Sequence, residues 1–465
     1  MKKSLSSITK KIVLTIVVIF PLISVPLILD NTSGVSATTH ETYKNLEIFS
    51  NVLSLIQKNY VEEVDTTEVL QGAIKGMLVS LDPHSSYLKP DDFKELKVET
   101  KGSFSGIGIE ITIKDGILTV VSPIEDTPAF KKGLKAGDRI IKIEGEFTKD
   151  MSLMDAVKKL RGPKGSAVTI SVHRQGWNQL KKVTITRGVI PLHSVKTKIM
   201  EAGYLYIRIS NFQSKTTNDF KKELRDFAAN EKIKGLILDL RNNPGGLLAQ
   251  AVKVSDIFID EGVIVSTKGR IKEQNMGYKA HSGGIDHDFP IVVLVNEGSA
   301  SASEIVAGAL QDHKIALIVG TQTFGKGSVQ TIIPMSNGAG LRLTTARYYT
   351  PNGTSIQAKG ITPDIMVENF IIDEEQTKNR RSRTLLREKD LKHHLTNGET
   401  PPEKEEEEVQ ETLENEEQEV QDLNGKGTEE ETGKEEESIE ELLDKDQQLT
   451  AALRILKGLN VLKVK

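Results

Sequence analysis

The spacing of apolar residues changes several times along the chain, and each change predicts a different kind of segment. Residues 38–96 carry apolar residues at helical spacing. Short β-type runs separated by turns fill residues 97–188, and apolar runs that alternate with helical patterns fill residues 189–396. Strands that alternate with helices favour an α/β layered fold for this largest segment. A chain of 465 residues has room for two or three domains.

Two short apolar runs, at residues 291–295 and 315–319, are predicted to be buried strands that lead into turns rich in glycine and serine. A helix is predicted to follow the first turn from Ser301, and Lys326 lies in the second turn. A serine hydroxyl is a weak nucleophile unless a neighbouring base takes its proton. Lysine can be that base only if burial lowers its pKa by several units from about 10.4. The pattern therefore suggests a serine–lysine pair, although the serines could also form an ordinary turn or helix cap.

The second turn permits another interpretation, because residues 320–326 have the GxxxxGK spacing of a phosphate-binding loop. Such a loop requires Ser or Thr directly after the lysine, at the start of a helix. Here Gly327 holds that position, and residues 328–333 have the pattern of a strand. The sequence therefore disfavours a nucleotide-binding protein.

Residues 296–305 (NEGSASASEI) and 324–330 (FGKGSVQ) resemble the signature of the carboxy-terminal processing proteases, also called tail-specific proteases. The resemblance extends over about residues 41–396 and implies a crotonase-like core, related to the caseinolytic proteases. It implies that Ser301 is the nucleophile, that Lys326 is the general base and that Gln330 orients the lysine. Ser299 and Ser303 are then not catalytic.

A second motif, DLRNNPGG at residues 239–246, also resembles this family. Acyl transfer needs N–H donors aimed at the oxyanion of the tetrahedral intermediate. The resemblance places one donor at Gly245 or Gly246, with Gly245 preferred, and another at Ala302. From the residues alone, glycine at this position is an ordinary turn residue.

Residues 97–188 resemble a PDZ domain of the circularly permuted type found in proteases. The motif LKAGDRI at residues 134–140 is the main support for this resemblance. The resemblance implies that the backbone N–H groups of a loop bind the C-terminal carboxylate of a peptide, while the peptide adds a strand to the sheet. That loop consists of Gly106, Ile107, Gly108 and Ile109. Taken alone, these four residues fit a bulged strand. Arg161, at the end of the predicted PDZ helix, is a candidate for coupling peptide binding to the protease body, or a cation at a helix C-terminus.

The two ends of the chain differ from the middle. Residues 1–37 combine lysines, an apolar run and small residues, which predicts a signal peptide or an uncleaved membrane anchor. The rest would then lie outside the cytoplasm, in a bacterial cell envelope, in the periplasm or on the outer face of the inner membrane. Residues 397–446 are dominated by glutamate and are predicted to be disordered, as a linker or an acidic binding tail. Residues 447–465 regain helical apolar spacing and predict an amphipathic helix.

Composition narrows the chemistry further. The chain has no cysteine, which excludes disulfides and thiolate catalysis, and its net charge of −4 gives no signal for nucleic acid. His84 could suggest a histidine-based triad, but the resemblance implies a turn or packing residue, because the family has a similar Asp-Pro-His-Ser motif without a histidine base. The other histidines show no metal-ligand spacing, and His313 is interpreted as a structural residue. We expect no metal, nucleotide or other cofactor.

Together these features predict an exported serine endopeptidase. The resemblance further implies that its PDZ domain recognises protein or peptide substrates with apolar C-terminal tails. The alternative is a catalytically silent PDZ scaffold of the cell envelope, but a scaffold would not need Ser301, Lys326 and Gln330 together. A membrane contact through an uncleaved N-terminal segment is one further expectation. A homodimer built by residues 38–96 and the terminal helix, and an adaptor or regulator protein, are partners that the sequence leaves open.

Overall fold

The computed structural model describes residues 33–114, 116–149, 151–284, 288–368, 387–395 and 438–463. They belong to two compact units, residues 1–76 and residues 77–465. Residues 1–32 of the predicted signal or anchor lie outside the described residues. Residues 397–437 of the acidic stretch lie outside them as well. Within the part that is described, no helix has both the length and the apolar character needed to cross a bilayer.

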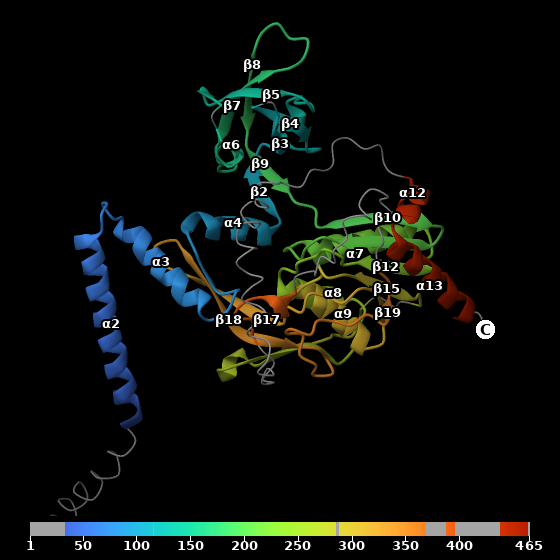
Figure 1. Ribbon diagram of the computed structural model, residues 1–465. Helices are drawn as coiled ribbons and strands as arrows, with labels where there is room; N and C mark the ends of the chain where they lie inside the picture. Colours follow the sequence, from blue (N-terminus) through green and yellow to red (C-terminus); the bar gives the residue numbers. More distant parts are fainter. Residues whose placement is uncertain are drawn as a thin grey trace, which may run out of the picture. The chain divides into compact units, whose positions relative to one another are not determined.

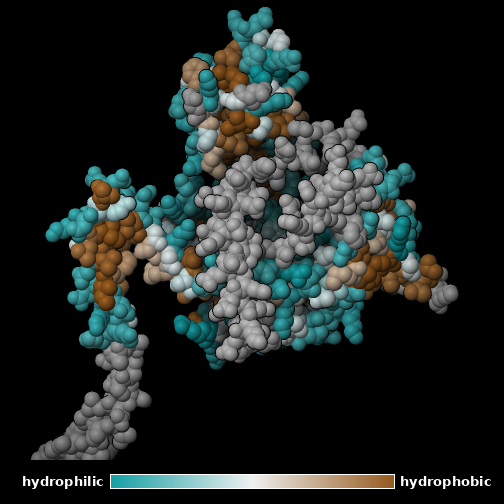
Figure 2. Space-filling view, in the orientation of Figure 1, coloured by the Kyte–Doolittle hydropathy of each residue, from teal (hydrophilic) through white to brown (hydrophobic). Residues whose placement is uncertain are grey.

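The described part of the first unit is helical, as its apolar spacing predicts. Helix α2 spans Ser33–Asn59, and helix α3 spans Thr66–Val79, across the boundary of the two units. Helix α2 exposes a row of large apolar side chains, visible as a brown stripe in Figure 2. These side chains are Leu46, Ile48, Phe49, Val52 and Leu55, and the ring of Tyr43 is exposed on the same helix.

A β-rich module occupies the segment in which short strands are predicted. Its sheet has the order β3-β4-β5-β7-β8, with β6 paired to β5. A separate pair, β2 with β9, stands at its base, and helix α4 precedes it (Figure 1). The order leaves β3 at the edge of the sheet, and helix α6 packs against it. The bounds are α4 Pro90–Lys101, β2 Ser103–Gly106, β3 Ile109–Lys114, β4 Ile117–Pro123, α5 Pro128–Lys131, β5 Arg139–Ile143, β6 Glu146–Phe147, α6 Leu153–Leu160, β7 Ala167–His173, β8 Lys181–Thr186 and β9 Gly188–Pro191.

A six-stranded sheet forms the centre of the α/β body, in the order β10-β11-β12-β15-β16-β19. All of its neighbours pair in parallel except β10 and β11. The central strands β12 and β15 are buried along their whole length, which explains why they are apolar except at Asp239, the last residue of β12. The bounds are β10 Val195–Glu201, β11 Tyr204–Ile209, β12 Gly235–Asp239, β15 Ile291–Val295, β16 Ala316–Gly320 and β19 Ile365–Met366.

Alternate residues of these central strands face two different cores. Val293 packs in the core formed with helices α7 (Thr216–Asn230), α8 (Leu248–Ser255) and α9 (Ala302–Asp312). Its neighbour Val292 packs in the core formed with the last helix of the chain. The sheet is therefore covered on both faces, and the α/β layering predicted from the sequence is present.

A second sheet carries the chain beyond Lys326. Strand β18 pairs with β17, β13 and β1, and β13 also pairs with β14. Lys326 lies in the connection between β16 of the first sheet and β17 of the second. The bounds are β1 Ser86–Leu88, β13 Val263–Gly269, η1 Lys272–Gln274, β14 Met276–Lys279, β17 Ser328–Pro334 and β18 Gly340–Tyr349.

Two helices end the described chain, α12 (Ile439–Lys445) and α13 (Gln447–Lys463), drawn in red in Figure 1. Helix α13 confirms the predicted amphipathic helix, because Leu449, Leu453 and Leu456 are buried against the sheet. The prediction of disorder is wrong for the last part of the acidic stretch. There Ser438 caps α12, and three apolar residues among the glutamates, Ile439, Leu442 and Leu443, pack against the same core.

Arg241, directly after β12, holds these terminal helices in place. Its guanidinium donates to both carboxylate oxygens of Asp239 at 2.7–3.1 Å and to both oxygens of Asp446 at 2.7 and 2.8 Å. It also donates to Gln448 at 3.1 Å. Burial raises the pKa of Asp239, but the hydrogen bonds and charge of Arg241 outweigh burial and hold this pKa below its ordinary value.

We expect Asp446→Ala to lower the free energy of unfolding by about 2 kcal/mol, because it leaves donors of a buried guanidinium unpaired. Asp444→Ala is the matched control, since Asp444 lies on the exposed side of α12. Urea unfolding of both variants measures the difference. Equal midpoints for the two variants would show that the Arg241–Asp446 contact does not anchor the terminal helices.

Candidate active site

Ser301 occupies the position that the sequence predicts, at the N-terminus of helix α9. The chain leaves β15 at Val295 and turns, and Ser301 is the residue before the first helical one. Its φ of 54° lies in the left-handed region, which is costly for a residue with a Cβ. The backbone must therefore be held there by other contacts.

The two neighbouring serines have structural roles. Ser299 and Ser303 are fully buried. The Ser299 hydroxyl donates to the carbonyl of Leu240 at 2.8 Å, and the Ser303 hydroxyl donates to the carbonyl of Asn243 at 2.9 Å. Both hydroxyls thus fix the turn after β12 against the turn after β15. Ser301 is half-buried, which suits a group that must reach a substrate.

Glu304, one turn into α9, joins the serine loop to the lysine loop. Its carboxylate is fully buried. One oxygen accepts the N–H groups of Ser301 at 2.8 Å and of Lys326 at 2.9 Å. The other accepts the Thr323 hydroxyl at 2.6 Å and the Gly325 N–H at 2.8 Å. Burial raises the pKa of Glu304 to about 7, although all of these donors favour the charged form. No sequence motif predicts a role for Glu304.

Lys326 has the electrostatic environment that a lysine base requires. Burial lowers its pKa below the ordinary value, and the charge of Arg342 on β18 acts in the same direction. The carboxylates of Glu388, Glu304 and Asp82 oppose this effect and raise the pKa, but the net shift is downward. A lower pKa increases the fraction of neutral amine at neutral pH.

Gln330 lies on β17, and its side chain is engaged with neighbours other than the lysine. Its amide donates to the Ser328 hydroxyl at 2.8 Å and reaches the Thr344 hydroxyl at 3.5 Å. The orientation of Lys326 by Gln330 therefore stays a prediction, and it would require the amide to rotate away from Ser328.

The turn after β12 brings its glycines to the serine. A Cβ on Gly245 would lie 2.8 Å from the Cβ of Ser301 and 3.0 Å from the backbone nitrogen of Ala302, so only glycine fits there. A Cβ on Gly246 would instead overlap the carbonyl of Phe212. The N–H of Gly245 donates to the Asn243 side chain at 2.9 Å. Gly245 is thus the glycine that adjoins Ser301 and Ala302, and the choice of oxyanion donor stays a prediction.

The predicted peptide-binding loop lies where β2 leads into the edge strand β3. Gly106 ends β2, Ile107 is buried, and Ile109 begins β3. Gly108 has a φ of 81°, and its carbonyl accepts the Thr127 hydroxyl at 3.0 Å. This contact fixes the loop at the end of the edge strand.

Arg161 directly follows helix α6 and connects it to helix α4. Its guanidinium donates to both carboxylate oxygens of Glu95 at 2.6 Å and lies over the ring of Phe104. Both Arg161 and Glu95 are partly exposed, so the pair adds little stability. The ion pair is of interest because it connects the end of helix α6 to helix α4.

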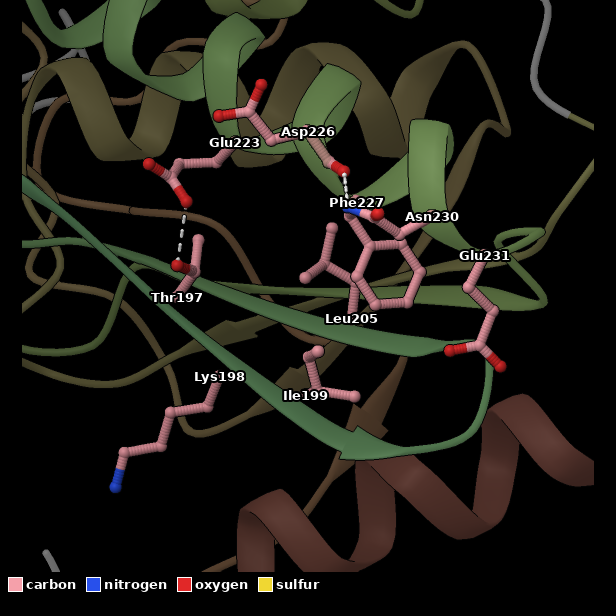
Figure 3. Close-up of a pocket in the computed structure, with 9 residues that line it drawn as sticks. All are labelled: Thr197, Lys198, Ile199, Leu205, Glu223, Asp226, Phe227, Asn230 and Glu231. Carbon is pink, nitrogen blue, oxygen red and sulfur yellow. Dashed lines mark hydrogen bonds between the residues drawn. The ribbon is translucent and has the colours of Figure 1, made fainter.

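A pocket between β10 and α7 contains none of the predicted site residues (Figure 3). Its lining residues are Thr197, Lys198, Ile199, Leu205, Glu223, Asp226, Phe227, Asn230 and Glu231. Among the residues that the structure describes, no group of three or more His, Cys, Asp or Glu side chains could hold a metal ion.

We expect Glu304→Gln to lower the free energy of unfolding by about 2–4 kcal/mol, because a carboxamide cannot accept all of the donors that surround it. Glu297→Gln is the control, since Glu297 accepts one hydroxyl, from Thr321. Urea unfolding between pH 5 and 8 measures both variants. Because the folded-state pKa of Glu304 lies above the ordinary value, its contribution to stability is full at low pH and falls as pH rises through about 7. Glu304→Gln should lack this slope, and an unchanged slope would contradict the assignment.

Three family models match the chain. The model of Peptidase family S41 matches residues 203–367, the PDZ domain model matches residues 105–185, and that of the activating protease CtpB N-terminal domain matches residues 29–92. These matches confirm the PDZ module and the protease body predicted from the sequence.

Similar proteins agree with these models. The carboxy-terminal-processing protease of Bartonella bacilliformis is 48% identical over 330 residues, which cover 70% of this chain and 76% of that protein. The carboxy-terminal processing protease CtpB of Bacillus subtilis is 39% identical over 348 residues, which cover 72% of this chain and 71% of that protein. The solved structure of the photosystem II D1 C-terminal processing protease is 32% identical, with a TM-score of 0.41, and the match covers 70% of this chain and 95% of that one. The chain belongs to the carboxy-terminal processing proteases of peptidase family S41.

Proposed function

We propose that this protein is an exported serine endopeptidase that uses Ser301 as nucleophile and Lys326 as general base. The observation that carries the proposal is the Glu304 carboxylate, one oxygen of which accepts the N–H groups of both residues. Two loops that are distant in sequence are thereby held together around a serine with strained backbone and a lysine of lowered pKa. Strain and perturbed pKa values concentrate at functional sites.

The proposed mechanism is acyl transfer. Neutral Lys326, which Gln330 orients after turning from Ser328, takes the proton of the Ser301 hydroxyl as the oxygen attacks the scissile carbonyl. Protonated Lys326 gives this proton to the leaving amine as the C–N bond breaks, and the lysine, neutral again, then takes a proton from the water that hydrolyses the acyl-enzyme. The N–H of Ala302 and that of Gly245 or Gly246 stabilise the oxyanion. Gly245 is favoured because it adjoins Ser301, and its N–H must turn from the Asn243 side chain to do so.

The PDZ domain is proposed to bind the apolar C-terminal tails of substrate proteins. The edge strand β3 offers unpaired backbone groups for an added peptide strand, and helix α6 flanks it. The loop of Gly106, Ile107, Gly108 and Ile109 is proposed to receive the terminal carboxylate. Arg161 is proposed to couple binding to cleavage through its ion pair with Glu95 of α4.

Export to the cell envelope rests on the lysines and apolar run of residues 1–29. A homodimer or a regulator protein would cover the exposed apolar row of helix α2, since such a row is costly to leave in water. The silent-scaffold alternative is less favoured, because a half-buried lysine without a catalytic task would only destabilise the fold.

We expect the full-length protein to cut an unstructured reporter with an apolar C-terminal tail, and to cut the same reporter with a charged tail more slowly. Ser301→Ala and Lys326→Met should each lower kcat on the order of 10³-fold or more, because each removes one partner of the reacting pair. Ser336→Ala is the control and should retain activity, since Ser336 is exposed in the turn between β17 and β18. Gel-based cleavage kinetics measure all four proteins.

Tail binding without cleavage by wild type would support the scaffold alternative. Cleavage by Ser301→Ala or Lys326→Met at the wild-type rate would refute the proposed mechanism.

We expect the ratio of cleavage rates for tailed and untailed reporters to approach one in Arg161→Glu, because the ion pair with Glu95 becomes a repulsion. Glu95→Arg should have the same effect alone. The double exchange restores an opposite-charge pair and should restore the ratio. If the ratio stays at the wild-type value in both single variants, the ion pair does not couple the PDZ domain to the site.

A further inference from the structure

A short segment beyond the protease core inserts a buried carboxylate next to the catalytic lysine. Residues 387–395 follow the range matched by the family model, which ends at residue 367. They contain the short helix η3 (Glu388–Asp390), where Glu388 is fully buried while Lys389 and Asp390 are exposed. The N–H of Glu388 donates to the carbonyl of Phe324, two residues before Lys326. A buried charge requires partners, so its contacts show what the segment does.

The first partner connects Glu388 to the backbone of the lysine loop. Gln357 is fully buried, and its amide nitrogen donates to Glu388 at 2.8 Å. The amide oxygen of Gln357 accepts the N–H of Gly327, the residue after Lys326, at 3.0 Å. Glu388 can only accept, so it determines which end of the Gln357 amide faces Gly327.

The second partner is His84, which the sequence analysis interpreted as a structural residue. Its Nε2 lies 2.7 and 2.8 Å from the two carboxylate oxygens of Glu388. The backbone N–H of His84 donates to the carboxylate of Asp82, which also accepts the Thr344 hydroxyl at 3.1 Å. The turn at residues 82–85 therefore holds His84 in place, and His84 fixes the position of the Glu388 carboxylate.

Charge gives a third connection between Glu388 and Lys326. Of the charged groups that act on Lys326, Glu388 has the largest effect, ahead of Arg342, Glu304 and Asp82. It attracts the protonated amine and partly offsets the burial of the lysine. Burial raises the pKa of Glu388, but the hydrogen bonds from His84 and Gln357 outweigh burial and lower it, so the group is charged at neutral pH.

We propose that Glu388 is a positioning residue of the peptidase site, which holds the Lys326 loop through Gln357 and tunes the charge of Lys326. The inference rests on the proposed roles of Ser301 and Lys326. The segment that carries Glu388 is thus part of the active site, although it follows the protease core in sequence.

Two substitutions separate the two effects. Glu388→Gln removes the charge and keeps an acceptor for Gln357, while the other tautomer of His84 can accept from the new amide. Glu388→Ala removes both the charge and the acceptor. Glu440→Gln removes an exposed carboxylate on α12 and is the control for net charge.

In the full-length protein, Glu388→Ala should lower kcat about 10- to 100-fold with KM changed less than about twofold. The reason is that the substitution displaces the base Lys326 but leaves substrate binding unaffected. Gln357→Ala should have a similar effect, and the double variant should be no worse than either single variant because both act along one path. Glu388→Gln should retain most of kcat. The acidic limb of its kcat/KM profile should move to lower pH, because Lys326 loses the carboxylate that favours its protonated form. Glu440→Gln should leave both quantities unchanged.

Amide hydrogen exchange of residues 323–330 in a Ser301→Ala background provides a readout that does not depend on cleavage. Exchange should be faster in Glu388→Ala and unchanged in Glu388→Gln, since Gly327 loses an ordered acceptor only in the former. Wild-type kcat and loop exchange in Glu388→Ala, or a higher kcat, would overturn the inference. An inactive wild type would refute the proposed function instead, and loop exchange would still test Glu388.

Discussion

The structure depends on one constraint, the satisfaction of the Glu304 carboxylate inside the protein. A carboxylate in a fully buried position is unfavourable unless donors surround it. Here the donors come from two loops, after β15 and after β16, so burying Glu304 requires both loops to close around it. The positive φ of Ser301 is one result, because the N–H of Ser301 must turn toward its own helix. The proposed reaction geometry thus follows from a structural requirement.

The sheet order explains why these two loops meet. Strands β12, β15 and β16 are parallel neighbours, so the turns at their carboxyl ends lie at one edge of the sheet. The turn after β12 contributes Gly245, the turn after β15 contributes Ser301, and the turn after β16 leads to Lys326. The second sheet then adds Arg342, and residues 82–85 and 387–395 supply the outer contacts. The site is therefore built in layers around the lysine.

Local patterns predicted the elements that carry the chemistry but not the contacts between them. The run at residues 291–295 is β15 as predicted, because burial on both faces demands apolar residues at every position. Glu304 has the pattern of an ordinary acidic residue in the first turn of a helix, and its partners near Lys326 follow about twenty residues later. Glu388 and His84 are 304 positions apart, beyond the reach of any periodicity. The glutamate-rich composition around Ile439, Leu442 and Leu443 predicts disorder. These three residues pack only because the six-stranded sheet and helix α13 supply an apolar surface for them.

The described residues before and after the acidic stretch attach to the same body, at Glu388 on one side and at Arg241 with Asp446 on the other. By connectivity alone, the chain between these two attachment points closes a loop. Its length can vary at little entropic cost, since the cost of closing a loop grows only with the logarithm of its length. A break in this loop would leave both attached parts in place through non-covalent contacts alone, converting a one-chain protease into a two-fragment complex whose integrity then depends on concentration.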